Sequence, residues 1–267
     1  MTADVPQGCV HQYQILGEHT EFVGLIIPGG WEEFFRFIGE PYDGPLFPTN
    51  DRRNPMEVLV PKLIQASEKF DMVPMRGHKG AEPTPCTDKD SSLPDSKTPF
   101  FLKADKGPRW AAGGLLVKPL VRPTQSGGKF AIARIEGSST IKNSPFAEQA
   151  LTFTTSHHAF LIDAGTFSFK INGETSTATF GETVFVPAGV SFSMAVTSRH
   201  GAAYAFTNGG GIVELLVGAG TPYSQQVISE NFPTDIVDVK AGEWSKLEKS
   251  CGVETASLES KTEALAV

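Results

Sequence analysis

One sequence element occurs twice in this chain, at two distant places. Residues 5–15 read VPQGCVHQYQI and residues 186–196 read VPAGVSFSMAV, an offset of 181 (186 − 5). Without any gap, ten of the 38 positions from 5 to 42 are identical at this offset, whereas roughly two or three identities are expected by chance from average composition. The identical pairs are Val5 and Val186, Pro6 and Pro187, Gly8 and Gly189, His19 and His200, Gly29 and Gly210, Gly30 and Gly211, Glu33 and Glu214, Gly39 and Gly220, Pro41 and Pro222, and Tyr42 and Tyr223. The pattern predicts a duplicated domain.

The second copy has the alternating pattern of short β-strands. In TFSFKIN, at residues 166–172, apolar and polar side chains alternate, and the turn NGE at 172–174 leads into the next strand. In the strand that follows VPAG, Phe192, Met194 and Val196 share one face. Short strands separated by glycine and proline turns predict an all-β jelly roll. We expect Phe192 and Met194 to fill its lumen.

The first copy is incomplete in this chain. The second copy begins near Gly113, and 113 − 181 = −68, so about 70 residues of the first copy have no equivalent here. An isolated barrel edge leaves backbone groups unpaired, which favours a truncated gene model or start site. The alternative is a duplication that was always partial, with the short segment packed as an extra layer on copy two. We expect four parts: residues 1–50 from a truncated first jelly roll, 51–108 as a helix and irregular linker, 109–223 as a complete second jelly roll, and 224–267 as a partly disordered extension.

A few short helices are expected outside the strands. WEEFFRFIGEP, at residues 31–41, has apolar side chains at helical spacing and ends in Gly39. Asn54 followed by Pro55 is typical of a helix start, and Pro61 predicts an interruption of that second helix. Residues 224–267 should add one more short helix, with the last ten residues disordered.

Composition limits the classes of partner. The 267-residue chain is 40% hydrophobic and carries a net charge of −7 with no basic patch, which argues against nucleic acid. No stretch is apolar enough for a membrane span, and no signal sequence opens the chain. Three cysteines, an odd number without metal-type spacing, favour a reducing compartment. We therefore expect a cytoplasmic protein.

The repeated element resembles the second motif of the cupin family. VPQGCVHQYQI followed by TEFVGLIIPGGWEEFF is similar to the end of the N-terminal cupin in fungal bicupins of the quercetin 2,3-dioxygenase type, and residues 115–223 resemble their C-terminal cupin. Similar bicupins are the cupin-domain oxidoreductases of fungal polyketide pathways that make salicylaldehyde-type aromatics. The resemblance implies a bicupin whose first cupin is truncated.

The resemblance also implies a metal site. Family members bind copper or iron in the first cupin through a His-x-His pair, a Glu and a third His, and His11 occupies the third histidine position here. The other ligands are missing from this chain. In copy two, counting back from Gly165 places Thr152, Thr154, His158 and Phe192 at the four ligand positions, so we expect that cupin to hold no metal.

These residues lead to three function hypotheses. The first is a metal-dependent cupin oxidoreductase of dioxygenase type, acting on an aromatic or polyketide small molecule in secondary-metabolite biosynthesis. The second is a metal-free cupin that binds a small molecule, and the third is a metal-free cyclase or isomerase. Lumen candidates for substrate contact are Tyr13, His158, Phe192 and Met194; because adjacent strand residues point to opposite faces, only one of His157 and His158 can enter the lumen. A homodimer is also expected.

Overall fold

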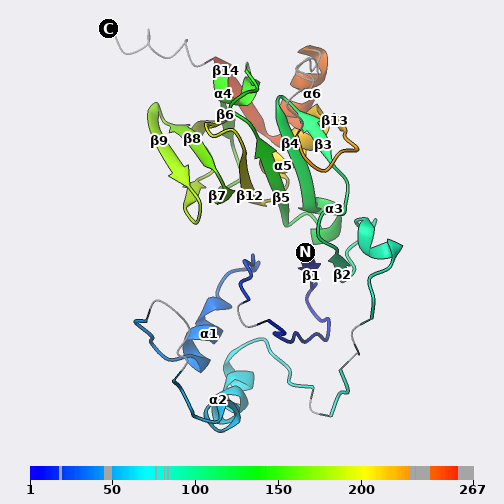
Figure 1. Ribbon diagram of the computed structural model, residues 1–267, viewed down its shortest axis with the longest axis vertical. Helices are drawn as coiled ribbons and strands as arrows, with labels where there is room; N and C mark the ends of the chain where they lie inside the picture. Colours follow the sequence, from blue (N-terminus) through cyan, green and yellow to red (C-terminus); the bar gives the residue numbers. More distant parts are fainter. Residues whose placement is uncertain are drawn as a thin grey trace. The chain divides into compact units, whose positions relative to one another are not determined.

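The computed structural model describes most of the chain and divides it into two units. The described residues are 1–17, 20–44, 50–75, 77–80, 82, 84–142, 144–228, 232 and 241–257 (Figure 1). Met1–Cys9 and Thr84–Val267 form one unit, which we call the β-rich unit; Val10–Pro83 form the other, which we call the helical unit. None of the described helices is long and apolar enough to cross a membrane.

The helical unit contains the two helices that the sequence predicts there. Helix α1 spans Glu32–Ile38 and ends at Gly39, whose N–H donates to the Phe35 carbonyl at 2.8 Å. Helix α2 spans Pro55–Lys69, and the Asn54 side chain accepts a hydrogen bond from the Met56 N–H at 3.0 Å, as expected for an N-cap. The interruption expected at Pro61 is absent, because proline fits the helical φ and the helix loses only one backbone hydrogen bond there.

Aromatic contacts join the two helices. The Trp31 ring stacks on Phe34 with 4.6 Å between centroids, and Phe70 lies edge-on to Phe34 at 5.6 Å and to Trp31 at 6.2 Å. Phe34 is buried, whereas the neighbouring Phe35 is 50% exposed. The aromatic side chains of the first repeat therefore form a small cluster, and part of its apolar surface stays uncovered.

The strands expected in the first repeat are absent. Residues 11–17 and 20–27 contain no strand, although their equivalents in the second repeat form β11 (Ser191–Val196) and β12 (Gly201–Asn208). In the second repeat β11 pairs with β6 and β8, and β12 pairs with β5 and β7. The part of the chain that the structure describes contains no second set of those partner strands. The duplication predicts the same strand, turn and strand path for residues 5–42 and 186–223, and this prediction is wrong.

The turn before these segments is the same in both copies. The Cys9 N–H donates to the Pro6 carbonyl at 3.2 Å, and the Val190 N–H donates to the Pro187 carbonyl at 3.2 Å. The glycines within these turns have φ values of 87° at Gly8 and 79° at Gly189, a region that glycine adopts readily. A turn needs only local hydrogen bonds, so it forms without partner strands.

The β-rich unit has the jelly-roll topology that the sequence predicts. Its core strands are β5 (Phe130–Gly137), β6 (Gln149–Phe153), β7 (His158–Ala164), β8 (Thr166–Ile171), β9 (Glu174–Thr179), β10 (Thr183–Val186), β11 and β12. They form nested antiparallel pairs: β8 with β9, β7 with β10, β6 with β11, and β5 with β12. This is a long hairpin wound into a double-stranded β-helix, which is the cupin jelly roll.

Further strands and short helices surround this core, and β1 and β2 form a separate two-stranded sheet. The seven-stranded sheet has the order β10-β7-β12-β5-β4-β3-β13, and the five-stranded sheet has the order β14-β6-β11-β8-β9. The added elements are β1 (Thr2–Asp4), β2 (Phe100–Leu102), β3 (Trp110–Ala112), β4 (Leu115–Val121), β13 (Thr221–Pro222), β14 (Val253–Ser257), the 3-10 turn η1 (Asp88–Ser91), α3 (Pro123–Ser126) and α4 (Pro145–Glu148). The core lies between the sheets and includes Phe160, Phe167 and Phe169.

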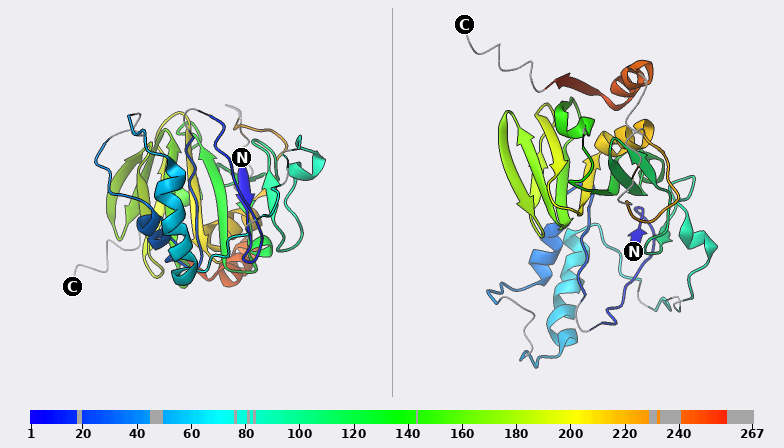
Figure 2. Two further views of the ribbon diagram at one scale, coloured as in Figure 1. Left: turned by 90° about the horizontal axis from the view of Figure 1, so that it is seen from below. Right: turned by 45° about the horizontal axis from the view of Figure 1, so that its top comes forward.

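Two helices close one side of the jelly roll. Helix α5 spans Gly211–Ala219, and α6, the helix expected within 224–267, spans Ala241–Cys251 and packs against α5 (Figure 2). Shifted by 181, these ranges become 30–38 and 60–70, close to the bounds of α1 and α2. The duplication therefore includes a pair of packed helices in each copy. The expected disorder of the last ten residues falls outside the described residues.

Candidate functional site

The metal ligand expected in the first repeat lies in an exposed segment. His11 and Tyr13 belong to the helical unit, and Tyr13 is 70% exposed with its ring 5.5 Å from that of Phe22. Across the part of the chain that the structure describes, no group of three or more His, Cys, Asp or Glu side chains could hold a metal ion. The described residues therefore do not by themselves fit a copper or iron centre.

Of His157 and His158, only His158 has its side chain inside the second jelly roll. It begins β7 and is 1% exposed, while His157 is exposed. Its ring lies 4.4 Å from Phe153, 5.6 Å from Phe192 and 6.1 Å from Phe160, measured between centroids. Its Nε2 accepts a hydrogen bond of 3.1 Å from the Ile212 N–H in the first turn of α5. His158 therefore satisfies a backbone donor at the start of that helix.

The surroundings keep His158 neutral. Burial lowers its pKa to about 4, the charge of His157 acts in the same direction, and the Ser156 main chain acts against it. Because Nε2 accepts, the neutral ring carries its hydrogen on Nδ1, which is buried without a hydrogen-bond partner among the described residues. A proton could reach Nε2 only if the bond to α5 broke. The geometry gives His158 a structural role and little capacity for acid-base catalysis.

The remaining lumen positions are apolar. Phe192 and Met194 are 1% and 3% exposed and belong to the core between the sheets. On β6, Leu151 and Phe153 face that core, so the count that placed Thr152 and Thr154 there was wrong by one residue. Side chains on a strand alternate between faces, so a slip of one residue reverses every assignment. Aromatic and aliphatic side chains fill the lumen of the second cupin.

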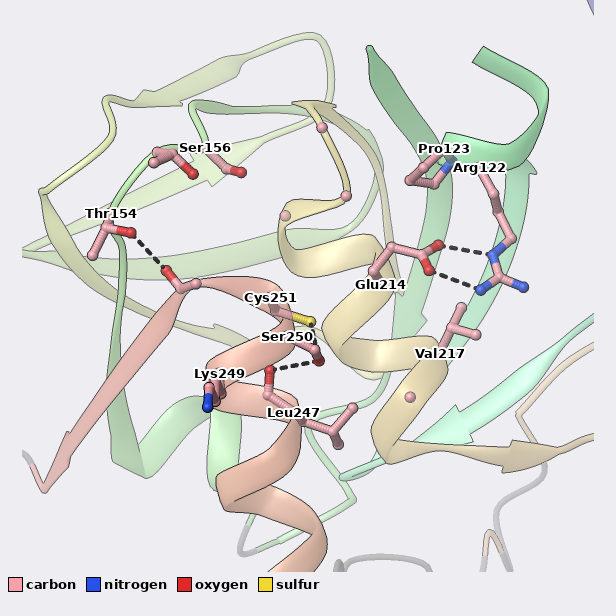
Figure 3. Close-up of a pocket in the computed structure, with 16 residues that line it drawn as sticks. Arg122, Pro123, Thr154, Ser156, Glu214, Val217, Leu247, Lys249, Ser250 and Cys251 are labelled. Atoms are coloured by element: carbon pink, nitrogen blue, oxygen red, sulfur yellow. Dashed lines mark hydrogen bonds and ion pairs between the residues drawn. The ribbon is translucent and has the colours of Figure 1, made fainter. Parts of the chain in front are cut away.

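A cavity of about 620 Å³ lies beside the lumen, between the jelly roll and the helix pair (Figure 3). We call it the α5–α6 cavity. Its walls come from residues 122–123, 154–156, 209–211, Glu214, Val217, Gly218, Leu247 and residues 249–252. All of them belong to the β-rich unit. No sequence motif marks the cavity, because the segments that form its walls are distant in the sequence.

An ion pair forms one wall of the cavity. Arg122 donates through Nε and Nη2 to the two carboxylate oxygens of Glu214, both at 2.8 Å, as the paired dashed lines in Figure 3 show. The hydrogen bonds to Glu214 raise the pKa of Arg122. A bidentate pair of this kind fixes both side chains in one geometry.

Hydroxyl and thiol groups form the opposite walls. Thr154 Oγ1 donates to the Gly252 carbonyl at 3.2 Å, and Ser250 Oγ donates to the Leu247 carbonyl at 3.1 Å. Cys251 Sγ lies 3.8 Å from Ser250 Oγ, and burial raises the pKa of its thiol. The thiol therefore stays protonated at neutral pH.

A second charged cluster lies on the seven-stranded sheet. Glu136, which is 1% exposed, pairs with Lys118 at 2.6 Å and with Arg134, and Arg134 also contacts Asp163 at 2.9 Å. Because each charge has an opposite partner, the cluster joins β4, β5 and β7 without leaving an isolated buried ion. The cluster therefore links three strands of the sheet through ion pairs.

Two known proteins that are similar to the chain share one name. No family model matches the chain. Quercetin 2,3-dioxygenase of Bacillus subtilis is 35% identical over 72 residues, covering 27% of this chain and 20% of that protein. Quercetin 2,3-dioxygenase of Aspergillus japonicus is 24% identical over 258 residues, covering 86% of this chain and 70% of that protein. The chain is a distant relative of the quercetin 2,3-dioxygenases.

The solved structures that resemble the chain include cupins. A predicted oxalate decarboxylase from Thermotoga maritima has a TM-score of 0.32 and 16% identity, covering 38% of this chain and 91% of that chain. The cupin domain of Schizosaccharomyces pombe Cnp3 has a TM-score of 0.29 and 16% identity, covering 36% of this chain and 64% of that chain.

Proposed function

We propose that this chain is a cupin oxidoreductase of dioxygenase type that acts on an aromatic or polyketide small molecule in secondary-metabolite biosynthesis. The observation that carries the proposal is the 24% identity to the Aspergillus quercetin 2,3-dioxygenase over 86% of the chain. Quercetin is aromatic, which supports an aromatic substrate for this chain. The repeat adds support, because it places His11 within the motif that both copies share.

The proposed cofactor is copper or iron, and His11 is the residue of this chain proposed to bind it. The described residues hold no complete ligand set, so the proposal places the remaining ligands outside the described residues. The second cupin, filled by side chains such as Phe192 and Met194, would serve as a structural platform.

A second candidate is a cupin that binds a small molecule without catalysis. The lack of a metal-ligand group among the described residues and the presence of the α5–α6 cavity favour it. Cyclase or isomerase chemistry in the second lumen has less support, because Nε2 of its buried histidine already accepts from the Ile212 N–H.

The genomic sequence upstream of Met1 separates the two candidates. An open reading frame that continues upstream with His-x-His and a nearby Glu supports the oxidoreductase. An upstream stop codon, or a continuation without those ligands, leaves the binding protein as the better proposal.

A biochemical test uses the protein encoded by the longest open reading frame that includes residues 1–267. We expect it to bind copper or iron and to consume dioxygen with quercetin as the probe. His11→Ala should abolish metal binding and dioxygen uptake because it removes one ligand directly. His78→Ala, a change of an exposed histidine in the same unit, should leave both unchanged. Full activity in the His11→Ala protein would contradict the proposed role of His11.

A further inference from the structure

The size and walls of the α5–α6 cavity suit a small organic ligand. Its volume of about 620 Å³ falls within the range of roughly 300–1,000 Å³ that is typical of ligand pockets. Its walls come from the rim of the jelly roll, the start of α5 and the end of α6. The cavity does not involve His11, so an inference about it is independent of the proposed oxidoreductase activity.

Charge at the cavity favours an anion. Among the described residues that line it, Arg122 and Lys249 are cationic and Glu214 is the one carboxylate, which leaves one positive charge in excess. Arg122 and Glu214 neutralise each other through their bidentate contact, so the excess charge belongs to the exposed Lys249. The whole chain has a net charge of −7, so this excess is local to the cavity.

The start of α5 adds main-chain surface to the same wall. A Cβ on Gly210 would lie 2.5 Å from Glu214 Cγ, and a Cβ on Gly211 would lie 2.7 Å from His158 Nε2. Packing therefore requires glycine at both positions, and the main chain of Gly210 and Gly211 lines the cavity, whereas the Ile212 N–H of the same turn already donates to His158. The partial positive charge of a helix start also favours an anionic group.

Apolar side chains complete the lining. Val217 and Leu247 project from α5 and α6, and Pro123 lies at the start of α3. The hydroxyl groups of Thr155 and Ser156 stand on the jelly-roll side of the same cavity. A ligand that matches this lining has one negatively charged group and an apolar body.

We propose that the α5–α6 cavity is a binding site for small monocarboxylates with an apolar body. The carboxylate interacts with Lys249 and the first turn of α5, and the body contacts Val217 and Leu247. Cys251 lies on the cavity wall, so an occupant shields its thiol.

Alkylation of the cysteines by iodoacetamide tests this site. Peptide mass spectrometry follows Cys251 in the cavity and the exposed Cys86 in the same protein, with benzoate as the probe and benzamide as its neutral analogue. We expect benzoate to slow alkylation of Cys251 in a saturable manner, to leave Cys86 unchanged, and to act at lower concentration than benzamide.

Two lysine variants provide the matched comparison. Lys249→Ala should weaken the apparent affinity for benzoate by about threefold, the effect of one exposed charge. Lys246→Ala removes an exposed lysine of α6 that does not line the cavity and should have no effect. The proposal is overturned if benzoate does not protect Cys251, if benzamide protects it equally, or if the two variants behave alike. None of these outcomes depends on oxidase activity or on a metal.

Discussion

Helices α1 and α5 occupy equivalent places in the repeat but have different surroundings. Phe35 of α1 is 50% exposed, whereas its equivalent Leu216 of α5 is fully buried beneath the jelly roll. The V-P-x-G turn and the helices form in both copies, but residues 11–17 and 20–27 of the first copy form no strand where the second copy has β11 and β12. Turns and helices close their hydrogen bonds locally, whereas a strand needs a neighbour. The difference shows which parts of a cupin sequence fold without the rest of the sheet.

The largest predicted effect concerns these equivalent core positions. Leu216→Ala should lower the free energy of unfolding of the β-rich unit by about 3 kcal/mol, because it opens a cavity under a buried helix. Phe35→Ala should cost less than about 1 kcal/mol in the helical unit, because half of that side chain is already exposed. Urea unfolding of both variants measures the difference. Equal losses would show that α1 is covered as well as α5.

Acidification should destabilise the second copy through His158. Its native pKa of about 4 lies below the unfolded value of 6.5, so the unfolded state binds the proton more tightly. The stability contributed by the neutral ring is complete above pH 6.5 and is lost as the pH falls toward 4. The loss approaches about 3 kcal/mol. Unfolding midpoints measured between pH 6.5 and 4 give the slope of stability against pH.

A glutamine variant isolates that histidine. His158→Gln keeps an oxygen that can accept from the Ile212 N–H but removes the titrating group. Its stability should change much less between pH 6.5 and 4 than that of the unmodified protein. If the slope of stability against pH is the same in the variant as in the unmodified protein, groups other than His158 cause the acid sensitivity.

The third prediction compares the glycines at the two helix starts. Gly30 and Gly211 both have positive φ, 107° and 47°, but a Cβ would meet no atom within 4 Å at Gly30 and would meet His158 and Thr207 at Gly211. Gly30→Ala should therefore cost about 1 kcal/mol from backbone strain. Gly211→Ala should cost about 2 kcal/mol or more, because steric overlap adds to that strain. Urea midpoints that do not differ would contradict the close contact with His158.

Much of the fold could be predicted from local sequence. The alternation in TFSFKIN identified β8, Asn54 and Pro55 identified the start of α2, and the repeated V-P-x-G identified a turn present in both copies. The strands of the first copy could not be predicted correctly, because an alternating segment becomes a strand only when a neighbour supplies hydrogen bonds.

The candidate site was less accessible to sequence reasoning. Strand alternation indicates that only one of His157 and His158 can enter the lumen, and the structure buries His158. Counting from Gly165 misplaced the β6 positions, because a loop length that differs by one residue reverses the face. The α5–α6 cavity joins segments about 130 residues apart, such as Arg122 and Cys251, and only tertiary structure brings them together.

The smallest predicted effect concerns a glutamate that both copies retain. Glu33 and Glu214 lie in the first turn of α1 and α5, so both gain similarly from the helix dipole. Glu33 pairs with Arg36 on the same exposed helix, whereas Glu214 makes two 2.8 Å contacts with the partly buried Arg122 on another element. Glu214→Gln should therefore cost about 1 kcal/mol and Glu33→Gln less than about 0.5 kcal/mol. Unfolding in high salt should reduce the cost of Glu33→Gln more than that of Glu214→Gln, because salt screens the exposed pair more strongly. If both substitutions cost the same at every salt concentration, the bidentate contact adds nothing to what the helix dipole already provides.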